Sequence, residues 1–286
     1  MQPSLHFVTT LAEDTAHVSD PLRLARGLTT ALLAVMSVQA GMGLVVQTAY
    51  RDVDWIRATW FGNDWVTLLV AVPLLLTGFV RAAAGSTRGL LLWLGLIGYA
   101  LYNYAFYLFA AALNAFFPLY VAALVLAATL LILALSHIEA RRVAESFRPT
   151  TPVRFIGGSL MFVGLGLASV WTVMWAFYIF AGRPTPIETE AFKLVAALDL
   201  SLMIPTLTVG GVLLWRRMPC GYVIAAIAAT QGALYLFVLS VNSLVAIQRG
   251  IANPPGELPV WGTLTIFTAA VAVLVFANVR SDRSGF

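Results

Sequence analysis

Apolar runs long enough to cross a bilayer dominate this sequence, and they restrict the chain to a helical bundle in a membrane. Of its 286 residues, 60% are hydrophobic and 10% are charged, whereas a soluble domain carries about 25% charged residues. Backbone polar groups in a hydrocarbon layer must be satisfied internally, as they are in an α-helix. We therefore expect an all-α integral membrane protein with eight transmembrane helices, at residues 22–49, 66–80, 89–112, 119–135, 155–180, 192–215, 222–247 and 260–279.

The basic residues predict the direction in which the spans run. An even number of spans puts both chain ends on one side, and loops on the cytoplasmic side carry the excess of Lys and Arg. We therefore expect a plasma or inner membrane protein whose N-terminal tail (1–21), basic loop (137–154) and C-terminal tail (280–286) are cytoplasmic. Of the 17 Lys and Arg residues, all lie on the predicted cytoplasmic side except Arg51, Arg57, Arg183, Lys193 and Arg249.

The two halves of the chain match each other when one is shifted along the other. The matches predict a 4+4 parallel internal repeat, with four-helix halves at 22–136 and 155–279 that share one orientation. Repeats of this kind commonly place binding sites where the halves meet. A shift of 128 residues pairs Asn103 with Gln231 and Tyr107 with Tyr235, and a shift of 132 pairs Pro73 with Pro205.

A single acid stands out within the predicted spans. Asp199 is the only ionisable residue that we place in the hydrocarbon core. A charged side chain there costs about 2.5–3.5 kcal/mol on the insertion scale, so it should face protein or water and marks a candidate functional site. Pro205, in the same span, removes a helical hydrogen bond and is a candidate hinge.

The interval between the first two spans is polar and aromatic. Hydrophobic residues recur in it at helical spacing, which predicts a short interfacial helix from Tyr50 to Asp64. Trp55 and Trp60 in this interval, and Trp65 directly after it, fit an aromatic belt at the membrane surface.

Polar and aromatic side chains follow helical spacing in the spans near Asp199. They predict an outward-facing pocket between the third, fifth, sixth and seventh spans, with the acid at its base. Aromatic walls, amides and a carboxylate suit a small neutral or cationic molecule, and the buried acid could carry a proton. Contacts between neighbouring helices are the alternative explanation. The candidate ligand-binding residues are Asp199, Asn103, Tyr107, Gln231, Tyr235, Asn242, Trp171 and Trp175.

These features favour a small-molecule binder or transporter that uses Asp199 as a proton or cation site. A sensory or accessory subunit, whose polar helix faces bind a partner chain, is the alternative. An enzyme is the least favoured class, because the sequence shows no nucleophile–base pair and no phosphate-binding loop. We expect no cofactor, no metal and no nucleic-acid partner. Membrane lipid is an expected partner, and a homo-oligomer or a partner subunit is possible.

Two segments resemble segments of bacterial multi-pass membrane proteins of unassigned function. They are YNYAFYLF (102–109) and the pattern D–P–G–LLWRR–P–GY from Asp199 to Tyr222. Each predicted half is also similar to four-helix DoxX-like membrane proteins, in its number of spans and in a polar residue early in the second span. Neither resemblance implies a reaction or a set of site residues.

Overall fold

The computed structural model describes residues 21–280, and within them the chain is helical. Eight helices are long and apolar enough to cross a membrane, as a multi-pass membrane protein requires. Nearly all of the two predicted tails lies outside the described residues. These candidate spans are α2 (Pro21–Val45), α3 to α4 (Asp54–Ala83), α5 (Thr87–Ala110), α6 (Phe117–His137), α8 (Val153–Ala181), α9 to α10 (Thr189–Trp215), α11 (Pro219–Gln248) and α12 (Leu258–Ala277).

Local sequence signals explain several of the helix starts. Proline has no amide hydrogen to lose in the first helical turn, and Pro118, Pro219 and Pro259 stand there in α6, α11 and α12. Ser86 precedes α5, and its hydroxyl accepts a hydrogen bond from the amide of Gly89. These signals define the short connections between antiparallel neighbours.

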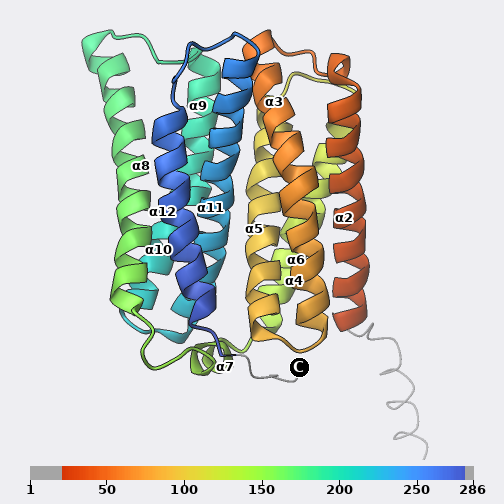
Figure 1. The fold of residues 1–286 in the computed structure, drawn as a ribbon, viewed down its shortest axis with the longest axis vertical. Helices are drawn as coiled ribbons and strands as arrows, with labels where there is room; N and C mark the ends of the chain where they lie inside the picture. The colour runs from red at the N-terminus through yellow and green to blue at the C-terminus, as the bar shows by residue number, and fades with distance from the viewer. Residues whose placement is uncertain (1–20, 281–286) are drawn as a thin grey trace, which may run out of the picture.

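Helices α5 and α11 form the centre of the bundle. In their most apolar stretches, 78% of the α5 residues and 67% of the α11 residues are buried, against 11% for α8 and 17% for α12. Figure 1 shows α2, α3, α4 and α6 grouped with α5, and α8, α9, α10 and α12 grouped with α11. The contact between α5 and α11 therefore joins the first four spans to the last four.

The second span differs from its prediction. The expected interfacial helix and short span 66–80 form one continuous helical segment, which comprises α3 (Asp54–Val66), η3 (Thr67–Ala71) and α4 (Val72–Ala83). The polar residues of α3 misled the prediction, because several of them face the protein. Trp60 is fully buried and does not belong to an aromatic belt, whereas Trp55 and Trp65 are exposed.

Two spans contain a wide π-helical turn at the same place relative to a proline. The turn η3 precedes Pro73, and η4 (Asp199–Met203) follows α9 (Thr189–Leu198) and precedes Pro205 in α10 (Ile204–Trp215). In η4 the amide of Ile204 donates to the Asp199 carbonyl five residues earlier. The irregularity that the sequence predicts at Pro205 thus takes the form of a π turn, and Asp199 is its first residue.

The described ends of the chain lie at the same end of the bundle, as an even number of spans predicts (Figure 1). We call this the proximal end. The basic loop folds at this end into the short helix α7 (Ala140–Glu145). The amide of Arg280 donates to the Ser146 carbonyl, and the Arg88 guanidinium donates to the Val279 carbonyl. We call the opposite end, which carries the 46–53 connection and the short 3-10 helix η2 (Gln47–Ala49), the distal face.

Candidate functional site: two buried carboxylates

Asp199 is fully buried and accepts hydrogen bonds from three other helices. On Oδ1 it accepts the Tyr102 hydroxyl of α5 at 2.5 Å. On Oδ2 it accepts the Trp171 indole N–H of α8 at 2.8 Å and the Tyr235 hydroxyl of α11 at 3.2 Å. The acid therefore ties α5, α8 and α11 to the π turn.

The donors around Asp199 are all neutral. No ion pair in the described residues involves this acid, and the pairs that exist are exposed ones within α3, within α9 and at the start of α7. Hydrogen bonds to a charged acceptor are about twice as strong as neutral ones, and they offset part of the desolvation of an ionised carboxylate. With no cation to complete the compensation, the site suits an acid that can exist with or without a proton.

The structure contradicts the prediction that Asp199 is the only acid inside the spans. Asp64 of α3 is also fully buried. It accepts the Gln39 amide at 3.0 Å and the Tyr107 hydroxyl at 2.8 Å on Oδ1, and the Tyr50 hydroxyl at 2.6 Å on Oδ2. No ion pair in residues 21–280 reaches it. The bundle thus holds two buried acids, each with three neutral donors.

The two acids lie at equal depth along their spans. Asp64 lies ten residues after Asp54, and Asp199 lies ten residues after Thr189. Both helices start at the distal face (Figure 1). At a rise of about 1.5 Å per residue, each acid is about 15 Å along the helix from that end.

Stacked aromatic rings enclose Asp64. Tyr107 stacks on Trp60 at 4.8 Å and on Tyr120 at 5.1 Å between ring centroids. The Tyr104 hydroxyl donates to Gln39 Oε1 at 3.0 Å, which orients the amide towards the acid. A β-carbon on Gly43 would overlap Asp64 Oδ2 and the Tyr50 hydroxyl. The close approach of α2 to the carboxylate therefore requires glycine at that position.

The residues predicted to form one site lie in separate places. Trp171 and Tyr235 do contact Asp199. Tyr107 instead donates to Asp64, and Asn103 donates to Thr67 at 3.5 Å. Asn242 contacts Asn63, and the Trp175 side chain is 51% exposed on α8. Helical spacing identified a shared face in each span, but not the helix that this face meets.

Sequence reasoning missed Tyr102, Asp64, Gln39 and Tyr50 as members of the two clusters. Asp64 was assigned to the polar interval because Asp52, Asp54 and Arg57 precede it. The helical spacing of hydrophobic residues in that interval continues from Trp60 to Asp64. Extending this face by one turn would have placed the acid inside the span.

A groove lies between the two halves on the proximal side of Asp199. It has a volume of about 230 Å³, and α5, α6, α10, α11 and the π turn line it. Its polar residues are Tyr102, Ser201, Thr206 and Gln231, and the rest of the lining is apolar apart from Gly98. Gln231 is 4% exposed, and its amide has no hydrogen-bond partner among the described residues. The groove is therefore lined by an amide that is free to bond to a ligand.

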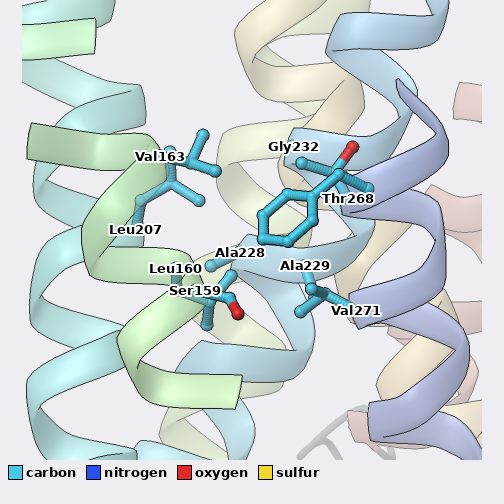
Figure 2. A pocket seen from close by; sticks show the side chains of 10 residues that line it. Ser159, Leu160, Val163, Leu207, Ala228, Ala229, Gly232, Thr268 and Val271 are labelled. Carbon is cyan, nitrogen blue, oxygen red and sulfur yellow. The ribbon is translucent and has the colours of Figure 1, made fainter. Parts of the chain in front are cut away.

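Two further cavities differ from the groove. A pocket of about 370 Å³ at the distal face is lined by Tyr50 together with Gln47, Thr48, Asp54, Arg57, Arg249 and Ile251. A void of about 10 Å³ lies between α8, α10, α11 and α12 (Figure 2). In Figure 2, Leu160 and Val163 of α8 lie across this void from Val271 of α12. It has room for about one water molecule, so it is a packing defect and not a binding site.

None of these three cavities is lined by Asp199. The predicted pocket, open to the outside with the acid at its base, is therefore not among them. The groove is connected to the acid by Tyr102, whose hydroxyl bonds to it, and by Ser201 and Leu202 of the same π turn. Within residues 21–280, no group of three or more His, Cys, Asp or Glu side chains could hold a metal ion.

Comparison with protein-family models, with curated proteins and with solved structures finds no match to this chain.

Proposed function

We propose that this protein binds, and carries across the membrane, a small neutral molecule in the groove between its halves, and that a proton on Asp199 controls that binding. The observation that supports this most directly is the position of Tyr102. It lines the groove, and its hydroxyl donates to Asp199 Oδ1. A change in the charge of the acid therefore reaches the groove through one hydrogen bond.

The lining of the groove favours a molecule that is apolar apart from one polar group. Ligand pockets are mostly apolar, with a few placed polar groups, and typically measure about 300–1,000 Å³. The groove, at about 230 Å³, lies just below that range. Gln231 supplies an amide without a partner that can both donate and accept. A small amide or alcohol would satisfy it.

A neutral ligand fits the groove better than a cation. The lining contains no charged side chain, and both oxygens of Asp199 already accept hydrogen bonds. A cation would need a charge partner that the groove does not offer. Of the two ligand classes that the sequence allows, the structure thus supports the neutral one.

Protonation of Asp199 would change what Tyr102 can do. An ionised carboxylate holds the phenol hydroxyl as a donor through a charge-assisted bond. A protonated acid is a weaker acceptor, which frees the hydroxyl to bond to a molecule in the groove. We therefore expect ligand binding to strengthen as the acid takes up a proton, which is a direct route to proton-linked transport.

The proposed duplication is supported by the donors as well as by the π turns. The shift of 132 that pairs the two prolines also pairs Gln39 with Trp171, and each donates to the acid of its own half. The shift of 128 pairs Tyr107 with Tyr235, which do the same. Asp199 itself pairs with Thr67, so the two acids lie one helical turn apart in the shifted register. A site between two such halves matches the usual place for repeat transporters.

Thermal stability of the purified protein in the presence of benzamide and short-chain alcohols tests this proposal. We expect these probes to stabilise the wild type, more so at low pH, and to lose this effect in Gln231→Leu. Gln248→Leu, on the same helix but outside the groove, is the matched control. Equal stabilisation of both variants by the probes would place binding elsewhere.

One observation supports the alternative of an accessory subunit. Trp175 and Tyr178 on α8 are 51% and 40% exposed, on a helix that is otherwise exposed along most of its length. A partner chain could cover this face, and so could lipid. Crosslinking from position 175 in native membranes distinguishes a protein partner from lipid.

A further inference from the structure

We infer that Asp64 is a second proton-binding site, and that it exchanges protons with water at the distal face through the Tyr50 hydroxyl. This inference goes beyond the proposed groove and does not depend on it. It rests on the burial of the acid, on the geometry of its donors and on the pocket that Tyr50 lines.

The chemistry around Asp64 is that of an acid without a counter-ion. Its three hydrogen-bond partners are one amide and two phenols, all neutral donors. Removing an ionised carboxylate from water without a cation leaves a large uncompensated cost, which a bound proton removes. The hydroxyls of Tyr50 and Tyr107 can turn to accept when the acid is protonated. The cluster therefore accommodates both states without rearranging its helices.

Within the described residues, no basic side chain forms a hydrogen bond or an ion pair with Asp64. The titratable groups that face the acid are phenols from the 46–53 connection, α5 and α6, and charged groups occur only at the mouth of the cluster and of the distal pocket. The phenols are Tyr50, Tyr99, Tyr104, Tyr107 and Tyr120. At the mouth, Asp52 bonds to Trp60 and to the Ala112 amide, Asp54 pairs with Arg57, and Arg249 donates to Gln47.

Tyr50 connects the acid to the distal pocket. Tyr50 lines the pocket of about 370 Å³, and its hydroxyl donates to Asp64 Oδ2. Burial, and then the neighbouring Asp64, raise the pKa of Tyr50 above its ordinary range. The phenol therefore stays protonated and can act only by passing a proton on.

The transfer balances without any other reactant. A hydronium ion in the distal pocket gives a proton to the Tyr50 oxygen as the existing O–H bond of Tyr50 breaks. That proton forms a new O–H bond on Asp64 Oδ2, and water is left in the pocket. One proton moves from water to the acid, Tyr50 is unchanged, and no electron is transferred.

Infrared difference spectroscopy of the reconstituted full-length protein tests the site directly. Lowering the pH from about 9 to about 4 brackets ordinary and raised carboxyl pKa values. It should produce carboxylic-acid bands from two buried aspartates. Asp64→Asn should remove one band and Asp199→Asn the other. An unchanged spectrum in Asp64→Asn would overturn the inference, because Asp64 would then keep one charge state throughout.

A second measurement does not require a variant at the acid. Tyr50→Phe keeps the ring and removes the relay hydroxyl. After a pH jump, the Asp64 band should still appear, but roughly a hundredfold more slowly, the low end of what a positioned proton donor contributes. Tyr222→Phe, which removes a phenol at the proximal end of α11, is the control. An unchanged rate in Tyr50→Phe would overturn the route through Tyr50.

The two proposals can fail separately. Gln231→Leu should abolish binding of the groove probes and leave the Asp64 band intact. If the wild type shows no Asp64 band but binds the groove probes normally, the second proton site is ruled out and the groove proposal stands. Labelling aspartate carboxyl carbons with carbon-13 identifies the bands as aspartate in the unsubstituted protein.

Discussion

Tyr102 and Asp199 belong to opposite halves of the bundle, and the Tyr102 hydroxyl donates a 2.5 Å hydrogen bond to Asp199 Oδ1. The other two donors to this acid, Trp171 and Tyr235, come from its own half. The Tyr102 side chain thus couples the first half of the bundle to the acid of the second half. The first prediction concerns the removal of the Tyr102 hydroxyl.

Tyr102→Phe should destabilise the protein at high pH and much less at low pH. A hydrogen bond to a charged group contributes about 1.5–3 kcal/mol, and that contribution is present while Asp199 is ionised. It falls as the pH drops and the acid takes up a proton. Unfolding followed at several pH values checks this result, with Tyr222→Phe as the control. A loss of stability that does not vary with pH would mean that the acid keeps one charge state.

Asp199→Asn should show the opposite dependence of stability on pH. The amide matches the shape of a protonated carboxyl group, so at low pH the variant should be about as stable as the wild type. At high pH the carboxylate ionises, and its three neutral donors offset only part of the cost of its desolvation. We therefore expect the wild type to lose stability as the pH rises, whereas the uncharged variant does not, so the variant should gain relative to the wild type at high pH. A variant that is less stable than the wild type at high pH alone would show that the hydrogen bonds to the ionised acid outweigh its desolvation.

Gly43→Ala should disrupt the Asp64 cluster. The added methyl group would overlap Asp64 Oδ2 and the Tyr50 hydroxyl, and overpacking typically costs about 1–3 kcal/mol. Gly41→Ala, half a turn away on the same helix, has open space around its β-carbon and is the matched control. Thermal unfolding of the two variants measures the difference. Equal behaviour would contradict the close approach of α2 to the acid.

Trp171→Phe and Trp175→Phe should differ, although sequence reasoning placed both residues in one pocket. The first loses the N–H that donates to Asp199 Oδ2 at 2.8 Å. We expect a loss of about 1.5–3 kcal/mol at high pH. The second changes an exposed ring and should stay within about 0.5 kcal/mol of the wild type. Tryptophan fluorescence and unfolding on the same samples compare them.

The sequence was sufficient to predict the class of fold and most of the spans, because hydrocarbon imposes long apolar helices. It also pointed to Asp199, since that acid interrupts an otherwise apolar run. Asp64 was not predicted as a site residue, because the charged residues that precede it made its segment look like a polar interval outside the spans. Asn103 and Tyr107 show the second limit. Their spacing gives a common helix face, but the neighbour that this face meets depends on long-range packing that one sequence does not display.

The π turn that begins at Asp199 determines how the preceding helix, α9, is rotated about its axis relative to α10. A π turn commonly carries one residue more than an α-helical path would. At 3.6 residues per turn, one residue corresponds to about 100° of rotation and about 1.5 Å of rise. If η4 tightened into an α-helix, α9 would have to turn and slide as a screw against α10. That single motion would swing the carboxylate away from Tyr102, Trp171 and Tyr235 together, so release of the acid would be all-or-none.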